Sequence, residues 1–134
     1  MRGYTLDTNV VTALLKGNDN VLQKSRQALL AGFPVTLNAV SYYETKRGLL
    51  LPAFRQKLST FEHFCSLYGV VLLDRAALDK AAEIYASLRE AGLLLEDADI
   101  LIAALAFVND LTLVTANVKH FERIPGLPLE NWLV

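Results

Sequence analysis

Strand-like and helix-like segments alternate along the chain, and this alternation constrains the fold more than any other feature of the sequence. Short apolar or β-branched segments bounded by Gly, Pro, Asn or Asp predict strands at residues 3–6, 34–38, 70–73 and 111–115, with a shorter fifth strand near 128–130. Strands that are separated by helices need crossover connections. We therefore expect an α/β fold with a mainly parallel sheet of four or five strands, covered by helices on both faces.

Two of the intervening segments carry apolar residues at helical spacing, which predicts core-facing helices. The first stripe is Phe54, Leu58, Phe61, Cys65 and Tyr68, and the second is Leu78, Ala82, Tyr85 and Leu88. A third segment, residues 100–108, is an uninterrupted apolar run that is too long for a typical strand and predicts a buried helix. Asp99 leads this run, whereas Asp97 lies two residues earlier and would not share its helix face.

The bulk properties describe a folded protein without an export or membrane signal. A chain of 134 residues with 53% hydrophobic residues is predicted to form one domain, 1–134, that buries about two thirds of its unfolded surface. Residues 1–7 contain no apolar stretch of signal-peptide length, and the longest apolar run is about half of a membrane span. Cys65 is the single cysteine and cannot form an internal disulfide, so we expect a small buried thiol and a cytoplasmic protein.

Charge and missing motifs exclude several function classes. The net charge of -1 gives no overall basic field for non-specific binding of nucleic acid, although local cations such as Arg55 and Lys57 could still meet phosphates. Successive glycines are at least 14 positions apart, which rules out glycine-rich phosphate loops. The two histidines, His63 and His120, do not form a zinc set with one cysteine, and no Gly-x-Ser-x-Gly elbow is present.

Three acidic residues lie where predicted strands and helices meet. Asp7 directly follows the first strand, Glu44 lies in the helix after the second strand, and Asp99 heads the buried helix. Ligands of open α/β sheets bind beyond the carboxyl ends of the strands, so we expect the three carboxylates to converge there. Such carboxylates repel one another unless a cation or protons intervene. An all-oxygen ligand set suits Mg²⁺ or Mn²⁺.

Each acid also has a purely structural interpretation. Asp7 and Asp99 have positions from which they could cap helices, and Ser41 with Glu44 has the Ser-x-x-Glu spacing of a capping box. Asp74 follows the third predicted strand and could reach the same edge, but we interpret it as a helix cap. The joint placement of Asp7, Glu44 and Asp99 favours a shared site.

In their order and spacing, four segments resemble the PIN-domain ribonucleases, and most closely the VapC-type toxins of bacterial toxin–antitoxin pairs. The segments are Asp7-Thr8-Asn9-Val10, Ser41-x-x-Glu44, Asp99-x-x-Ile102-Ala103-Ala104 and the run from Leu113 to Phe121. The resemblance extends from residue 4 to the end of the chain. It implies a three-layer α/β/α sandwich and a metal-dependent endoribonuclease whose carboxylates are Asp7, Glu44 and Asp99.

The resemblance also implies a set of supporting residues and partners. Thr115 and Asn117 match the element that closes the family's site, and many relatives carry further acids where this chain has Asn117 and His120. A magnesium ion, for which manganese could substitute, would activate water for attack on an RNA phosphodiester. Lys46 and Arg47 are candidates for RNA phosphate contacts. The implied partners are an RNA substrate, a cognate antitoxin and a second copy of the chain, without a membrane.

Two other functions remain open from the sequence. A receiver-type signalling domain also uses an acid cluster on a doubly wound sheet, but its acceptor aspartate follows the central strand and only Asp74 is available here. A PIN-like module could instead retain the fold and serve only to bind another protein. The apolar residues of segments 21–30 and 40–51, including Leu49, Leu50 and Leu51, could accommodate a protein partner, although a run of three leucines is more often core.

Overall fold

A computed structural model describes residues 3–134 and contains, within that range, one parallel sheet of five strands in the order β3-β2-β1-β4-β5. Met1 and Arg2, which belong to the stretch that argues against a signal peptide, lie outside the described residues. The strands are β1 (Gly3–Leu6), β2 (Val35–Asn38), β3 (Val70–Val71), β4 (Leu111–Val114) and β5 (Leu129–Glu130). The predicted parallel sheet is confirmed, including its short fifth strand, although β3 ends two residues earlier than predicted.

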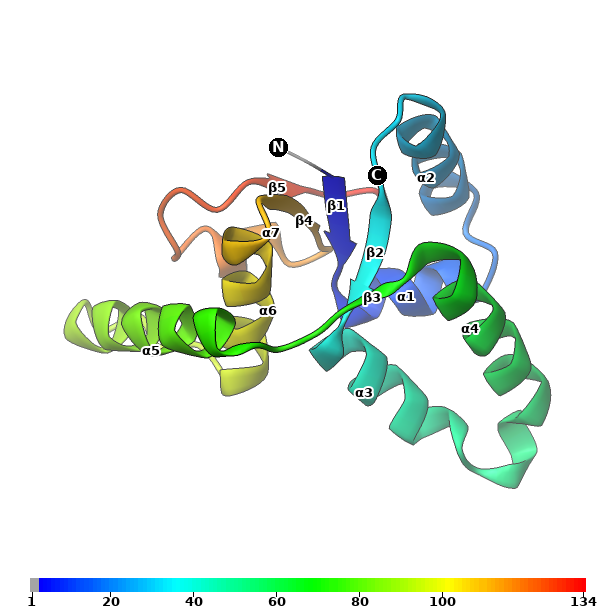
Figure 1. Ribbon diagram of the computed structural model, residues 1–134, viewed down its shortest axis with the longest axis horizontal. Helices are drawn as coiled ribbons and strands as arrows, with labels where there is room; N and C mark the ends of the chain where they lie inside the picture. The colour runs from blue at the N-terminus through cyan, green and yellow to red at the C-terminus, as the bar shows by residue number, and fades with distance from the viewer. Residues whose placement is uncertain (1–2) are drawn as a thin grey trace.

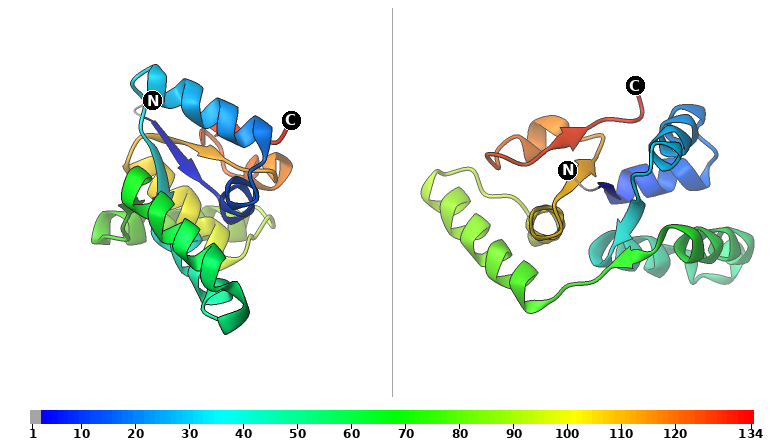
Figure 2. Two further views of the ribbon diagram at one scale, coloured as in Figure 1. Left: turned by 90° about the vertical axis from the view of Figure 1, so that its right-hand side faces the viewer. Right: turned by 45° about the horizontal axis from the view of Figure 1, so that its top comes forward.

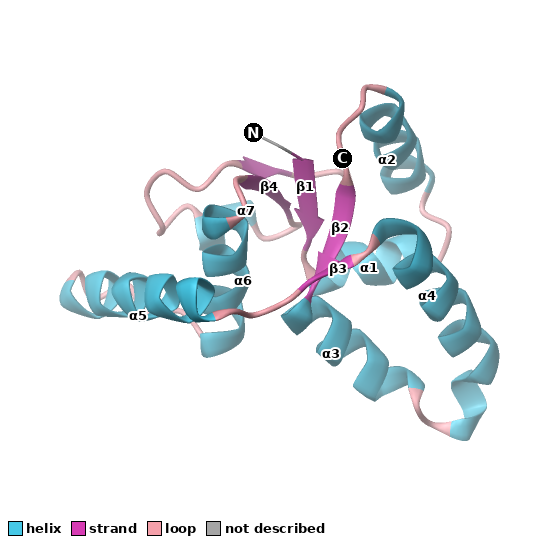
Figure 3. Ribbon diagram, in the orientation of Figure 1, coloured by secondary structure: helices cyan, strands magenta, loops and turns pink. Residues whose placement is uncertain are grey.

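The helices make up most of the described chain, and the strands between them are short (Figure 3). The helices are α1 (Thr8–Leu15), α2 (Asp19–Leu30), α3 (Ala39–Leu49), α4 (Arg55–Tyr68), α5 (Arg75–Glu90), α6 (Asp97–Val108) and α7 (Val118–Phe121), with a 3-10 turn η1 (Pro52–Phe54). Figure 1 shows α1 and α2 on one side of the sheet and α5 and α6 on the other, and the views in Figure 2 agree. The predicted three-layer arrangement is therefore confirmed.

Two apolar cores fill the layers on either side of the sheet. One core joins α1, α2 and α4 to the strands through fully buried residues such as Leu6, Leu37 and Phe61. The other joins α5, α6 and α7 to β4 through residues such as Ala103, Leu113 and Phe121. The predicted buried helix is α6, and its small alanines allow close packing against neighbouring elements.

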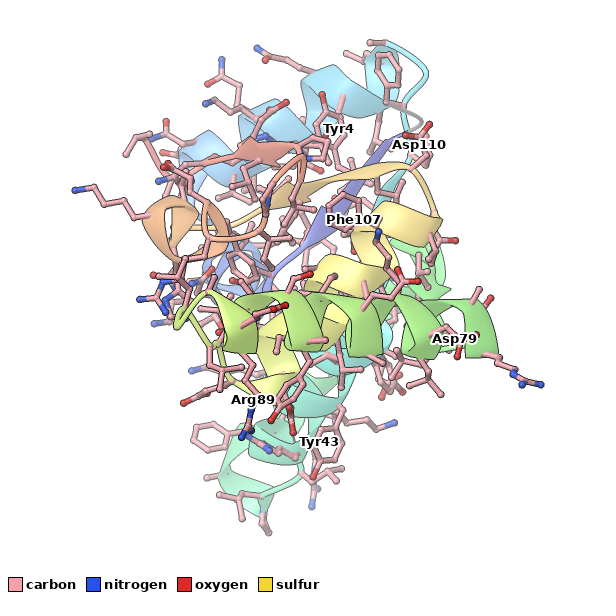
Figure 4. All side chains as sticks on the ribbon, turned by 90° about the vertical axis from the view of Figure 1, so that its left-hand side faces the viewer. Tyr4, Tyr43, Asp79, Arg89, Phe107 and Asp110 are labelled. Carbon is pink, nitrogen blue, oxygen red and sulfur yellow. The ribbon has the colours of Figure 1, made fainter. Side chains whose placement is uncertain are left out.

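The apolar stripe predicted on α5 is wrong by one position along most of its length. Ala77, Ala81 and Ile84 are buried with Leu88, whereas Leu78 and Tyr85 are exposed. Both sets have helical spacing. The set with Ala77 and Ala81 is the buried one because small side chains let α5 pack closely across α6 (Figure 4).

Two smaller expectations about apolar residues also need correction. Leu49 packs against the first core, but Leu50 and Leu51 are exposed where the chain leaves α3, so only the first residue of the three-leucine run belongs to the core. Cys65 on α4 is only partly buried, although it does pack against the first core.

No helix within residues 3–134 is long and apolar enough to cross a membrane.

Candidate active site

Asp7 stands at the carboxyl edge of the sheet, between the central strand β1 and helix α1. Its side chain is only 6% exposed. Oδ1 accepts a 2.8 Å hydrogen bond from the backbone N–H of Thr8 and so caps α1, while Oδ2 accepts a 2.7 Å hydrogen bond from the hydroxyl of Thr115. The cap and the buried hydroxyl together fix the orientation of the carboxylate.

The β1–β4 register explains why Thr115 reaches Asp7. Leu6 pairs with Val114 in the parallel ladder, so the next residue of each strand lies at the same edge. The hydroxyl of Thr115 also accepts a 3.0 Å hydrogen bond from the backbone N–H of Asn117, whose own side chain makes no helix-cap bond to α7. Asn117 thus orders the loop through its backbone.

Glu44 does not belong to the capping box that its spacing suggests. Helix α3 begins at Ala39, three residues before the start implied by a Ser41 cap, and the box is formed reciprocally by Asn38 and Ser41. Glu44 is therefore free to turn toward the start of α1, where its Oε1 accepts a 2.6 Å hydrogen bond from the hydroxyl of Thr8. Because the backbone N–H of Thr8 also donates to Asp7, Thr8 links the two acids.

Asp99 lies in the first turn of α6 but does not cap it, because Glu96 occupies the cap position. Its Oδ2 lies 3.0 Å from Nε2 of His120, so α7 supplies a partner for this carboxylate. Asp97, the alternative acid, is exposed. The choice of Asp99 over Asp97 thus agrees with the partly buried position of Asp99 at the edge of the sheet.

The three carboxyl groups share one electrostatic field. Burial raises the pKa of Asp7 above its ordinary value, and the charges of Asp99 and Glu44 raise it further, against the lowering effect of the hydrogen bonds from Thr115 and Thr8. Burial also raises the pKa of Asp99, where His120 acts in the opposite direction and Glu96 and Glu44 add to the rise. The structure therefore places the predicted acids near one another, so that Asp99 and Glu44 oppose the ionisation of Asp7, and Glu44 opposes that of Asp99.

The donor set fits a hard divalent cation. Besides the imidazole of His120, the groups at this edge are carboxylate and hydroxyl oxygens, and oxygen ligands are those that magnesium and manganese take. Within residues 3–134 no three His, Cys, Asp or Glu side chains form a ready-made metal-binding cluster. Magnesium commonly uses one or two carboxylates together with water and substrate phosphate, so a complete protein cage is not required.

The two predicted phosphate-binding residues have protein partners. Lys46 binds Glu62 on α4 at 3.0 Å and the hydroxyl of Tyr42 at 3.0 Å, and these hydrogen bonds raise the pKa of Lys46. Arg47 is more exposed and lies 4.0 Å from Glu44 Oε2. Arg47 is the better placed of the two for a phosphate near the acids, and a contact to RNA stays a prediction for both.

Sequence reasoning missed the side chains that position the acids. Thr8 contacts Glu44, and His120 contacts Asp99. No spacing pattern in the sequence predicts either contact. Asn38 is fully buried and donates to the hydroxyl of Thr5 at 3.2 Å and to the carbonyl of Leu6 at 3.1 Å. It ties the start of α3 to the end of β1 just before Asp7.

Comparison with known proteins places this site in a family. Residues 4–127 match the PIN domain family model. Ribonuclease VapC2 of Rickettsia felis is 28% identical over 96% of this chain and 97% of its own. The tRNA(fMet)-specific endonuclease VapC of Salmonella typhimurium is 30% identical over 98% of this chain and 99% of its own. The structure of VapBC2 from Rickettsia felis, bound to promoter DNA, superposes with a TM-score of 0.89 at 27% identity. The match covers 96% of this chain and 98% of that chain.

The chain therefore belongs to the PIN-domain family and, within it, to the VapC-type ribonuclease toxins. The resemblance of its motifs and the expected α/β/α fold are both confirmed.

Proposed function

We propose that the protein is a Mg²⁺-dependent endoribonuclease, with Mn²⁺ able to substitute, that hydrolyses RNA phosphodiester bonds as the toxin of a toxin–antitoxin pair. The observation that carries this proposal is the placement of the acids at one edge of the sheet, where Thr8 donates to both Asp7 and Glu44 and where the charge of Asp99 acts on Asp7. A bound cation offsets the repulsion between ionised acids at neutral pH. The name of the Salmonella relative, a tRNA-specific endonuclease, supports RNA as the substrate class.

Each residue has a distinct task in this proposal. Asp7 and Asp99 would hold the ion, which when bound lowers the pKa of water and offsets charge on the phosphate. Glu44 would be a third ligand or would orient and deprotonate the attacking water. The hydroxyls of Thr8 and Thr115 restrict the carboxylates of Glu44 and Asp7 to one orientation. Such outer partners are expected to matter nearly as much as the acids.

The decisive assay combines mixed structured RNA with purified protein in Mg²⁺, in Mn²⁺ and in EDTA. We expect cleavage in both metals and none in EDTA. Asp7→Asn and Asp99→Asn keep the shape of the side chains and are expected to abolish cleavage. Metal-independent cleavage, or full activity in either variant, would remove the proposal.

The structure argues against a receiver-type domain but does not distinguish a protein-binding module from a nuclease. Asp74 accepts a 2.9 Å hydrogen bond from the N–H of Ala77 and caps α5, after the edge strand β3. A receiver domain needs its acceptor at a central strand, so this position does not suit it. A protein-binding module without catalysis would show the same fold and no cleavage in the assay above.

We also propose a cognate antitoxin, a homodimer and a cytoplasmic site of action. Exposed leucines at two separate places support protein contacts, because large apolar side chains are exposed at each: Leu29 and Leu30 at the end of α2, and Leu50 and Leu51 after α3. Light scattering of the isolated protein and co-purification with the product of a neighbouring gene test these partners separately.

A further inference from the structure

A groove of about 300 Å³ opens beside Glu44, between α1 on one side and α3, η1 and α4 on the other. Glu44 and Thr8 form part of its wall, so the groove is continuous with the proposed active site. None of the proposed steps in phosphodiester hydrolysis uses the rest of this space. The residues that line the groove would therefore lie beside the reacting phosphate.

Most of the groove surface is apolar, and two lysines line it together with Glu44 and threonine side chains. Leu15, Leu49 and Phe54 line it, and the ammonium groups of Lys16 and Lys57 come from opposite sides. Lys57 Nζ lies 5.4 Å from the centre of the Phe54 ring. An apolar slot with one aromatic wall between two cations is complementary to a flat base attached to an anionic backbone.

Thr45 adds an unsatisfied polar group to this wall. Its side chain is 8% exposed, and among residues 3–134 its hydroxyl is the only buried side-chain N or O atom without a hydrogen-bond partner. Buried hydroxyls normally find partners, because leaving one unpaired lowers stability. The hydroxyl itself is covered, so a ligand in the groove would reach it only after the Thr45 side chain rotates.

We propose that this groove binds one unstacked nucleobase of the RNA substrate, next to the phosphate that the ion held by Asp7 and Asp99 would bind. The inference rests on the proposed ribonuclease function and extends it, because the groove would select where the strand is cut. An apolar side chain from a protein partner is the other conceivable occupant. It would leave the charges of Lys16 and Lys57 without an anionic partner, which is why the charge of the groove favours a nucleotide.

Gly48 provides a clean way to fill the groove. It lies on α3 in the wall, and a Cβ added there would meet no atom within 4 Å. Gly48→Phe therefore adds a ring to this wall, at a position where its Cβ meets no other atom, and leaves all three acids unchanged. Gly48→Ala is the matched control, since it adds a methyl group only. Both replacements raise helix propensity relative to glycine.

The first test measures nucleotide binding in EDTA by NMR, without dependence on cleavage. AMP, CMP, GMP and UMP are titrated separately into the full chain. We expect saturable shifts of the Thr45, Gly48 and Leu49 amides with at least one nucleotide, retained in Gly48→Ala and lost in Gly48→Phe. Thr45→Val is expected to lower the affinity for the preferred nucleotide about fivefold to tenfold, as expected for the loss of one hydrogen bond. No saturable shift with any of the four overturns the inference.

The second test maps cleavage sites in a randomised single-stranded RNA pool in Mg²⁺. Gly48→Phe is expected to lower kcat/KM at least tenfold or to lose the site preference of the unmodified chain, and Gly48→Ala is expected to change either property much less. Unchanged rate and sites in Gly48→Phe overturn the inference and leave the ribonuclease standing. Nucleotide shifts without any Mg²⁺-dependent cleavage overturn the proposed function instead. If circular dichroism shows that Gly48→Phe is unfolded, Thr45→Val carries both tests.

Discussion

The hydroxyl of Thr115 donates a 2.7 Å hydrogen bond to Oδ2 of Asp7, across 108 positions of sequence. The contact joins the ends of two neighbouring parallel strands, β4 and β1. It leaves Asp7 with one oxygen bound to a hydroxyl and the other bound to the backbone of Thr8. The orientation of the proposed metal ligand is therefore determined by the sheet itself rather than by a loop.

Loss of this hydroxyl is expected to weaken metal binding without unfolding the protein. Thr115→Val keeps the shape of the side chain but leaves Asp7 Oδ2 without its donor. Partners of this kind contribute about 10–100-fold to metal affinity or activity, so we expect a loss of that size in Mn²⁺ affinity by calorimetry. Thr115→Ser keeps the hydroxyl and should bind Mn²⁺ nearly as tightly. Equal affinities for the valine and serine variants would contradict this role.

Thr8 is expected to act on Glu44 in the same way. Thr8→Val removes the 2.6 Å hydrogen bond to Glu44 Oε1 and should lower kcat/KM for RNA cleavage by about 10–100-fold. Thr8→Ser retains the donor and serves as the control in the same assay. Wild-type kinetics in Thr8→Val would show that the orientation of Glu44 does not depend on this contact.

Asn38 is expected to be a stability residue close to the site. Asn38→Ala removes the cap of α3 and leaves the buried carbonyl of Leu6 without its donor. The loss of a cap and of buried hydrogen bonds should lower the free energy of unfolding by about 2–4 kcal/mol in urea titrations. Asn38→Ser can still cap the helix and should lose about half of that amount. A change below about 0.5 kcal/mol in the alanine variant would refute this assignment.

The fold and the acids could be predicted because they depend on local patterns. Strand and helix alternation gave the sheet, and the positions of Asp7 and Asp99 at element ends gave two of the proposed site residues. Residue spacing alone did not identify the cap of α3, because two capping arrangements compete there. Ser41 and Glu44 match a capping box, but Asn38 at the end of β2 takes the cap because helix α3 begins earlier. The contacts of Thr8 and His120 depend on tertiary packing and have no sequence signature.

The raised pKa values of Asp7 and Asp99 predict an unusual dependence of stability on pH in the absence of metal. Both pKa values lie above the ordinary value of 3.8, mainly because of burial. The folded chain therefore binds these protons more tightly than the unfolded chain. Stability should rise as the pH falls from 7 through the raised pKa values, and level off below the ordinary value. Thermal unfolding in EDTA across this range measures the effect.

The control for this pH dependence is the double variant Asp7→Asn, Asp99→Asn. It has no carboxyl group at either position, so its melting temperature should be higher at pH 7 and should change less between pH 7 and mild acid. Saturating Mn²⁺ should raise the melting temperature of the unmodified chain at pH 7 and not that of the variant. A melting temperature at pH 7 that is lower in the double variant would show that the two charges stabilise the fold.

The most direct test of the account is the anomalous diffraction of crystals soaked in Mn²⁺. We predict a manganese peak at the carboxyl edge of the sheet, within bonding distance of carboxylate oxygens from both Asp7 and Asp99. Crystals of Asp99→Asn, soaked in the same way, should show a much weaker peak. A peak elsewhere, or equal occupancy in the variant, would contradict the claim that these acids form one metal site.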